Sequence, residues 1–416
     1  MDKQKITAIE GIKKKLLGKT IDYTEALAIM KEFSTGGLSD IFVAYFAASS
    51  FQKGFSDDEL YFLTKAMVES GTKFKFPGVV ADKHSIGGMP GTRTTLVVVP
   101  IIAAAGFLIP KTSSRAITTP AGTADCMEIL APVDIEKAKL QKIVETVGGC
   151  IVWGGHLGVA PADDVIIRVE EPLMFESYDK VIISILAKKV AMSSNALILD
   201  IPVGPTMKIK YVKDAQKFAK RFEKLAAKFN IEMKSEINYQ FQPAGSGIGP
   251  LFETQDALRV LEQTADRPMN LEDKSLKLAS RLIDLCLKQS KQKGDGLVIA
   301  EEILKSGKAL KKFREIVEAQ GGRGDFSSTG FKLAANHVEV KATKTGTVQI
   351  VNNFSISALA KILGAPKHRK AGLILHKKFG EKIAKNDILF ELYAEQATKI
   401  EEALASMGNL PIYEIT

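Results

Sequence analysis

DKHSIGG at residues 82–88 is followed by SSR at 113–115 and AGTAD at 121–125, three short polar stretches separated by largely apolar sequence. Two of these stretches carry glycine turns that we expect to open helices, with hydroxyl and ammonium groups at the openings. The first turn of a helix presents unpaired backbone N–H groups and partial positive charge, which favour a bound phosphate. The pattern therefore predicts an anion site built on glycine turns.

The loop GGMPGTRTT (87–95) leads into an apolar run that we predict to be helical as far as residue 105. It matches neither the Walker pattern nor the GxGxxG fingerprint of dinucleotide sites, and a purely structural glycine turn would explain it equally well in isolation. Phosphate donors are available around the loop at Lys83, His84, Ser85, Ser113 and Thr123. Such donors would satisfy a phosphate without a metal ion.

The alternation of elements along the chain predicts an α/β protein. Residues 4–70 have helical periodicity, whereas residues 74–153 alternate short β-branched runs with helices, including an expected strand at 107–111. Residues 162–191 return to a helical pattern that Pro172 should break. We expect a discontinuous helical domain (1–71 and 162–192), a large α/β domain with a mixed sheet (72–161 and 193–325), and a hammerhead-like C-terminal α/β domain (335–416).

The charge of the chain favours anionic ligands. The 416 residues carry a formal net charge of +9, and the pI is near 9.1. The spacing of Lys217, Lys220, Lys224 and Lys228 is typical of a solvated helix face rather than of an RNA groove. Aromatic residues make up only 7% of the chain, so we expect no nucleic-acid partner.

The cysteines and the apolar segments indicate a cytoplasmic protein without a metal. Cys126, Cys150 and Cys286 are widely spaced and form no CxxC pair, so we expect buried reduced thiols. The first thirty residues lack the apolar core of a signal peptide. The longest apolar run, 96–110, is interrupted by proline and glycine, so we expect no membrane partner.

A second polar cluster is predicted on the later helical segment. Ser184 and Lys188 are four residues apart and share a helix face, with Arg168 upstream, so together they could hold a planar polar ligand. From the pattern alone, surface lysines and an incidental serine are the better interpretation.

Several separated motifs, in order along nearly the whole chain, resemble those of the thymidine and pyrimidine-nucleoside phosphorylase family, and this resemblance favours the ligand-binding interpretation. The motifs are KHSxGG (83–88), SxR (113–115), GTxDxxE (122–128), APAD (160–163) and SILAKK (184–189).

The resemblance implies phosphorolysis, in which inorganic phosphate attacks C1′ of a nucleoside and releases the free base and a sugar 1-phosphate. It implies that phosphate is held by Lys83, Ser85, Gly88, Thr94, Thr95, Ser113 and Thr123. It implies that the base is held by His84, Arg168, Ser184 and Lys188. His84, Arg168 and Lys188 would act in catalysis, because negative charge building on the departing base is stabilised by cationic donors.

The same resemblance implies closure of the helical domain onto the α/β domain, which excludes water and favours phosphorolysis over hydrolysis. It implies no cofactor, since inorganic phosphate is a co-substrate. It also implies a homodimer whose other partners are only the small-molecule nucleoside or nucleotide.

The motifs MPG (89–91), WGG (153–155) and DIPVGP (200–205) resemble the AMP phosphorylase branch of this family, which also includes bacterial thymidine phosphorylase-like members. That branch implies nucleoside 5′-monophosphates as substrates and ribose 1,5-bisphosphate as product. Lys208 would then contact the 5′-phosphate, although an ordinary loop lysine explains it equally well. Against this alternative, GSG (245–247) stands where archaeal members are expected to have an arginine, and the sequence starts directly with helices.

Two further interpretations concern the architecture. The C-terminal hairpins around GTV (346–348) and FGEKI (379–383) resemble lipoyl or biotinyl carriers, but no lysine stands in the turn that would be modified. An anthranilate phosphoribosyltransferase-like enzyme would share the architecture, but it would need acidic magnesium ligands near the glycine loop. The sequence there offers no such motif, so nucleoside phosphorolysis remains the expected activity.

Overall fold

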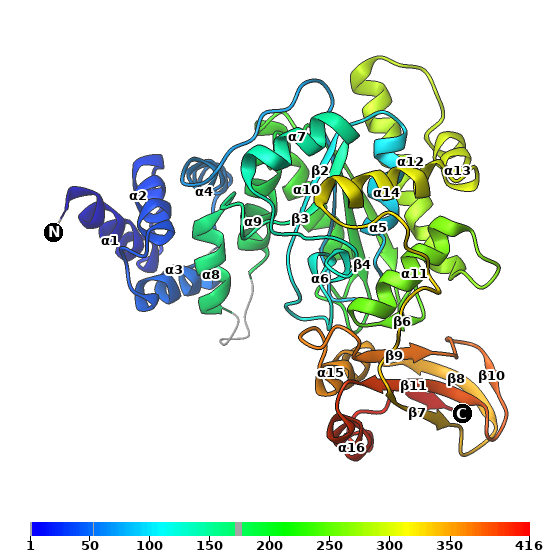
Figure 1. Ribbon diagram of the computed structural model, residues 1–416. Coiled ribbons are helices and arrows are strands. Elements are labelled where there is room, and N and C mark those ends of the chain that lie inside the picture. The colour runs from blue at the N-terminus through cyan, green and yellow to red at the C-terminus, as the bar shows by residue number, and fades with distance from the viewer. Residues whose placement is uncertain (1, 53, 171–176) are drawn as a thin grey trace. The chain divides into compact units, whose positions relative to one another are not determined.

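The computed structural model describes residues 2–52, 54–170 and 177–416, and Figure 1 shows its helices and strands. The chain divides into two compact units. Unit 1 comprises residues 1–82, 154–197 and 217–233, and unit 2 comprises residues 83–153, 198–216 and 234–416. The mixed helix and sheet content confirms the predicted α/β class.

Unit 1 is largely helical. Its helices are α1 (Lys3–Leu16), α2 (Tyr23–Ser34), α3 (Asp40–Gln52), α4 (Asp57–Glu69), α8 (Pro161–Glu170), α9 (Tyr178–Ala191) and most of α10 (Val212–Lys228). The later helices α8 and α9 pack against α2, α3 and α4, so the bundle is discontinuous in sequence. Pro172, the expected break, lies outside the described residues. The four lysines predicted on one face of α10 are all exposed.

Local sequence signals explain where two of these helices begin. Ser56 precedes α4, and its hydroxyl accepts the N–H of Glu59 at 3.2 Å while the Glu59 carboxylate accepts the N–H of Ser56 at 2.8 Å. Asp22 and Glu25 form the same reciprocal arrangement at the start of α2. Each arrangement satisfies two backbone donors that a helix start would otherwise leave unpaired.

Two strand groups organise the α/β region. One sheet has the order β1 (Ala81–Ser85), β4 (Ala196–Val203), β5 (Glu232–Tyr239), and the unit boundary passes through these strands. All eight residues of β4 are buried, as expected for a central strand. In unit 2, β2 (Ile109–Ser113) pairs in parallel with β3 (Gly149–Trp153), with Ile109 opposite Gly149.

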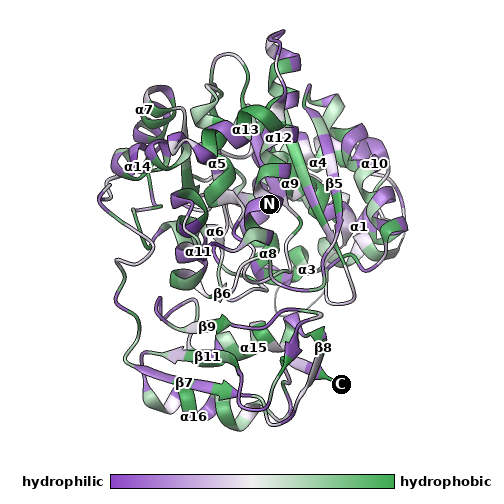
Figure 2. Ribbon diagram, turned by 90° about the vertical axis from the view of Figure 1, so that its right-hand side faces the viewer, coloured by the Kyte–Doolittle hydropathy of each residue, from purple (hydrophilic) through white to green (hydrophobic). Residues whose placement is uncertain are grey.

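Helix α5 (Thr95–Ala104) is a buried helix of unit 2. It packs against the β2–β3 pair and against α12 (Met269–Ser290) and α14 (Lys308–Gln320). Its sequence, TLVVVPIIAA, is apolar on every side, and Figure 2 colours it as hydrophobic, whereas α7 (Lys137–Val147) and α14 carry hydrophilic residues. A helix that is apolar on every side belongs in a core, so the first turn of α5 has a fixed position. The remaining helices of this region are α6 (Thr123–Met127), α11 (Pro250–Glu262) and α13 (Gly296–Lys305).

The C-terminal region of unit 2 is built from antiparallel strands and two helices. The sheets have the orders β6-β9-β11-β7 and β10-β8-β12. Their elements are β6 (Gly247–Ile248), β7 (Asn336–Lys341), β8 (Gly346–Val351), α15 (Asn353–Leu363), β9 (Gly372–Leu375), β10 (Lys382–Ile383), β11 (Ile388–Ala394), α16 (Ala397–Ser406) and β12 (Tyr413–Ile415). Because β6 pairs with β9, the segment that follows residue 240 is joined to the C-terminal sheet. No helix among the described residues is both long and apolar enough to cross a membrane.

Candidate active site

The ammonium of Lys83 is the centre of the predicted phosphate cluster. Lys83 is buried on β1, and its Nζ donates to Ser85 Oγ at 2.6 Å, Thr94 Oγ1 at 2.7 Å and Thr95 Oγ1 at 3.3 Å. Strand alternation places Lys83 and Ser85 on one face of β1, while Thr94 and Thr95 stand at the start of α5. One cation and three hydroxyls thus converge on a helix N-terminus, an arrangement that suits an anion.

A buried carboxylate supports this cluster and was not predicted from the sequence. Ser85 Oγ donates to Asp200 Oδ2 at 2.7 Å, and Lys274 Nζ lies 3.0 Å from Asp200 Oδ1. Lys274 also donates to Gln240 Oε1 at 2.7 Å. The sequence did contain a signal for this role, because Asp200 is the single carboxylate in the otherwise apolar strand β4 and a buried charge requires partners.

The glycine loop has a backbone that only glycine adopts readily. Gly87, Gly88 and Gly91 have φ of +86°, +96° and +61°. A Cβ on Gly88 would lie 3.6 Å from both Cγ and the backbone N of Lys208, so Lys208 runs alongside the loop. The N–H of Gly245 donates to the Gly91 carbonyl at 2.7 Å and ties the loop to the segment before β6.

The remaining predicted phosphate residues stand at the ends of β2 and the loop after it. Ser113 is the last residue of β2, and its Oγ donates to the Val152 carbonyl at 3.3 Å. Thr123 begins α6, and its Oγ1 accepts a hydrogen bond from Arg93 Nη1 at 3.4 Å. The preceding turn is held by Asp125, whose Oδ2 accepts the N–H of Gly122 at 2.7 Å.

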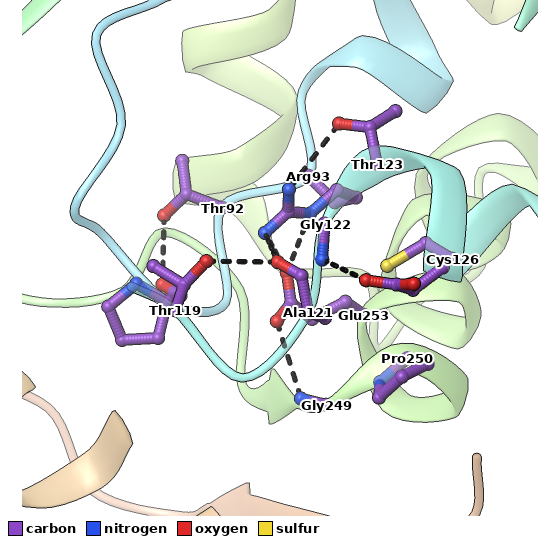
Figure 3. A network of polar contacts seen from close by, with 12 residues as sticks. Thr92, Arg93, Thr119, Ala121, Gly122, Thr123, Cys126, Gly249, Pro250 and Glu253 are labelled. Carbon is purple, nitrogen blue, oxygen red and sulfur yellow. Dashed lines mark hydrogen bonds and ion pairs between the residues drawn. The ribbon is translucent and has the colours of Figure 1, made fainter. Parts of the chain in front are cut away.

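Figure 3 shows the polar network behind this turn. Arg93 Nε donates to Glu253 Oε2 at 2.7 Å, and Nη2 donates to the Ala121 carbonyl at 3.0 Å. Burial raises the pKa of the Glu253 carboxyl, and Arg93 partly offsets this effect. Desolvation lowers the pKa of Arg93, but the charge of Glu253 outweighs it and the net pKa is raised. Neither residue was predicted as part of the site.

In unit 1, Asp163 joins two of the predicted base-binding residues. Asp163 Oδ2 accepts from Ser184 Oγ at 2.7 Å and lies 2.7 Å from Lys188 Nζ. Burial lowers the pKa of Lys188, but Asp163 and Asp164 outweigh that effect, so the net pKa is raised and the side chain is cationic. The next residue, Lys189, is fully buried against Asp82, 2.8 Å away, which fixes α9 against the start of β1.

A cavity of about 50 Å³ lies in unit 1 beside Ser184 and Asp163. Apolar side chains from the helical bundle form much of its wall, together with the Lys180–Glu170 ion pair. Burial lowers the pKa of Lys180 to about 7. The cavity residues are Met30, Phe46, Met67, Asp163, Ile166, Ile167, Glu170, Lys180, Val181, Ile183 and Ser184.

The surroundings of two further predicted residues are different. Arg168 makes a two-pronged ion pair with Asp40 on α3, with oxygen distances of 2.8 Å and 2.6 Å, and its side chain is 60% exposed. His84 is half-buried on β1, and strand alternation puts it on the face opposite Lys83 and Ser85. The described residues contain no group of three or more acidic, histidine or cysteine side chains placed to hold a metal ion.

Three family models match the chain in order along its length. They are the glycosyl transferase family helical bundle domain at residues 9–71, the glycosyl transferase family a/b domain at 78–310, and the pyrimidine nucleoside phosphorylase C-terminal domain at 347–412. The a/b model alone covers more than half of the chain.

Similar proteins carry two kinds of name. The "Putative thymidine phosphorylase" of Methylococcus capsulatus is 40% identical over 397 residues, covering 95% of this chain and 76% of that protein. The "AMP phosphorylase" of Methanosarcina barkeri is 41% identical over 396 residues, covering 95% and 78%. The anthranilate phosphoribosyltransferase structure from Thermus thermophilus has a TM-score of 0.61 at 18% identity, covering 74% of this chain and 99% of that one. It is similar in fold.

Proposed function

The chain belongs to the glycosyl transferase family that joins a helical bundle to an α/β domain, and we propose that it catalyses phosphorolysis of a pyrimidine nucleoside. Inorganic phosphate would form a bond to C1′ as the N-glycosidic bond breaks, giving free base and (deoxy)ribose 1-phosphate. The observation that carries this proposal is the buried Lys83 ammonium with the hydroxyls of Ser85 and Thr94 around it. The names of similar proteins support the same reaction class.

In the proposed mechanism, unit 2 holds the nucleophile. Lys83 neutralises phosphate charge, and Thr94, Thr95 and Thr123 donate hydrogen bonds, with Gly88 allowing the backbone to approach an oxygen closely. Ser85 and Ser113 would donate as well once their hydroxyls turn from Asp200 and from the Val152 carbonyl. No cofactor takes part, because phosphate itself supplies the nucleophilic oxygen. Holding phosphate in line with C1′ replaces a bimolecular encounter by a positioned one, which lowers the entropic part of the barrier.

The base would be held by residues of unit 1. Lys188 is cationic beside Asp163, and Ser184 shares that carboxylate, so both side chains are oriented toward one polar group. As the glycosidic bond breaks, negative charge builds on the base, and the Lys188 ammonium would stabilise it. Arg168 would have to leave Asp40 to reach the base, and His84 would donate a hydrogen bond or proton to it. We expect closure of the two units to complete the site.

The alternative is phosphorolysis of nucleoside 5′-monophosphates to base and ribose 1,5-bisphosphate. It is favoured by the position of Lys208 alongside Gly88, which puts a second cationic side chain at the glycine loop. It is also supported by the relative named AMP phosphorylase. A 5′-phosphate carries two negative charges near pH 7, so an extra lysine there would stabilise it.

One assay separates the two substrates. Phosphate-dependent base release is measured from thymidine, uridine, AMP, CMP and UMP, with Lys83→Met protein as the matched inactive control. Release from the nucleosides supports the main proposal, whereas release only from the monophosphates establishes the alternative. No release from any of the five compounds contradicts both.

We also propose that the enzyme is a cytoplasmic homodimer. Helix α3 supports the dimer, because Ile41, Tyr45 and Phe51 each expose more than half of their surface on one helix. A reducing compartment is supported by the three cysteines, which are all buried and form no disulfide.

A further inference from the structure

Glu253 on α11 is a buried carboxylate that accepts hydrogen bonds from the glycine loop and from the start of its own helix. The side chain accepts Arg93 Nε at 2.7 Å and the N–H of Gly249 at 3.3 Å. The backbone N–H of Gly91 also donates to it and lowers its pKa against the larger effect of burial. One acceptor therefore holds the glycine loop, the start of α11 and the guanidinium of Arg93. The Glu253 side chain has no exposed surface, so it depends on protein donors for its hydrogen bonds.

Arg93 extends this hold to the loop that carries Thr123. Its guanidinium is held by Glu253 and also donates to the Ala121 carbonyl at 3.0 Å and to Thr123 Oγ1 at 3.4 Å (Figure 3). The guanidinium is planar and rigid, so its three partners have a fixed spacing. Residues 91–93 and 121–123 are thereby locked to each other through one side chain.

The direction of the Arg93 hydrogen bond matters for phosphate. A threonine hydroxyl has one proton to donate and two lone pairs to accept. Arg93 occupies a lone pair of Thr123 Oγ1, which leaves the hydroxyl proton available to a phosphate oxygen. Without Arg93, Thr123 Oγ1 would lose this donor and its hydroxyl would be free to rotate.

We propose that Glu253 and Arg93 are positioning residues for phosphate: together they set the spacing between the glycine loop and the Thr123 turn and orient the Thr123 hydroxyl. The identity of the anion rests on the function proposed above. The positioning itself rests on the contacts of Arg93 and Glu253. Neither side chain needs to touch the substrate, since they act through Gly91 and Thr123.

The test compares charge-conserving variants of Arg93 and Glu253 with the same substitutions in another ion pair of unit 2. Arg93→Lys and Glu253→Asp keep both charges, which avoids burying an unpaired ion. Arg267→Lys and Glu272→Asp are the controls, because Arg267 and Glu272 also form a largely buried ion pair in unit 2, at 2.5 Å. The readouts are phosphate affinity by calorimetry without nucleoside, and the KM values for phosphate and nucleoside.

We expect the phosphate Kd and KM to rise about tenfold in Arg93→Lys and Glu253→Asp, with the nucleoside KM within twofold of wild type. The controls should leave all these constants within twofold. A phosphate Kd that is unchanged in both site variants, or that rises equally in the controls, overturns the proposal. If the wild type binds phosphate but releases no base, the proposed function fails while the binding comparison still decides the positioning.

A double-mutant cycle distinguishes positioning from a general loss of structure. Thr123→Val removes the hydroxyl through which Arg93 is proposed to act. Arg93→Lys should therefore raise the phosphate Kd much less in a Thr123→Val background than in the wild type. Fully additive effects would show that Arg93 acts independently of Thr123 and would contradict the orienting role. Thermal unfolding of each variant reports whether stability changes together with affinity.

Discussion

Lys188 tests the proposed base site at the level of one side chain. Its ammonium lies 2.7 Å from Asp163, and its net pKa is raised above the ordinary value, so it is charged at neutral pH. Lys188→Met keeps the length of the side chain but removes the charge that would stabilise the leaving base. We expect kcat to fall about 10²- to 10³-fold, measured as phosphate-dependent base release.

The control for Lys188 is Lys224→Met, which removes an exposed lysine of unit 1 that pairs with Asp57 at 2.6 Å. This change should leave kcat within twofold of wild type, because an exposed ion pair contributes little. Activity of Lys188→Met within threefold of wild type, with a normal circular dichroism spectrum, would contradict the assignment of Lys188 to the base.

The hydrogen bond between Arg115 and Glu128 makes the stability of the protein depend on pH. Its hydrogen bond from Arg115, 2.7 Å long, lowers the pKa of the carboxyl below the ordinary value of 4.5. The folded-state pKa is depressed, so the stabilisation is present above pH 4.5 and is lost as the pH falls through the folded-state pKa. Because both side chains are partly exposed, Glu128→Gln should lower the free energy of unfolding by about 1 kcal/mol at pH 7.

That difference is measured by urea unfolding at pH 7 and again at pH 3. We expect the Glu128→Gln and wild-type free energies to converge at the lower pH. The exposed pair Lys399–Glu402 supplies the comparison, and Glu402→Gln should change stability by less than about 0.5 kcal/mol at pH 7. A Glu128→Gln deficit that is the same at both values of pH would show that packing, rather than charge, is responsible.

In the glycine loop, the cost of replacing a glycine by alanine depends on the space around the residue as well as on its backbone angles. Gly87 and Gly91 both have positive φ, so alanine is strained at each. A Cβ on Gly87 would meet nothing within 4 Å, whereas on Gly91 it would lie 2.6 Å from Ile248 Cδ1 and 3.0 Å from the Gly247 carbonyl. Gly87→Ala should therefore cost about 1 kcal/mol, and Gly91→Ala should cost more because the loop must shift.

The two alanine variants are compared by thermal unfolding and by phosphate KM. We expect Gly91→Ala to raise the phosphate KM at least fivefold more than Gly87→Ala does, because Gly91 also donates to Glu253. Equal effects would indicate that backbone strain alone decides both positions. A smaller effect at Gly91 would contradict the close approach of the loop to β6.

At the element level, the sequence indicates correctly those features that depend on residues close together in the chain. Ser56 followed three residues later by Glu59 is the sequence signature of a capping box, and the structure forms this box because both partners lie within one turn. The sequence predicted a strand at 107–111, whereas the observed strand β2 spans Ile109–Ser113. Gly106 has φ of +89° and the Phe107 N–H still bonds to Ile102, so the end of α5 uses the residues expected to open the strand.

At the level of the whole molecule, the sequence could not predict contacts between distant segments. Arg93 and Glu253 are 160 positions apart, and neither helical nor strand periodicity marks their pairing. Lys83 and Ser85 were predicted because they directly precede the glycine loop and belong to a motif that resembles the family's. Asp200 and Lys274 complete that cluster from other elements, and only the tertiary fold brings them to it.

The proposed dimer is a property of the whole molecule that a single charge can test. Ile41 on α3 is exposed and stands on a helix whose apolar residues occur on every side. A lysine at this position would place an unpaired charge in an apolar interface, which costs several kcal/mol when it is desolvated. We expect wild-type protein to have the mass of a dimer in light scattering and Ile41→Lys to have that of a monomer.

Ile350 is also exposed but lies on β8, so Ile350→Lys should leave the dimer intact. A monomeric wild type would contradict the dimer, whereas a dimeric Ile41→Lys would exclude the α3 face as its interface.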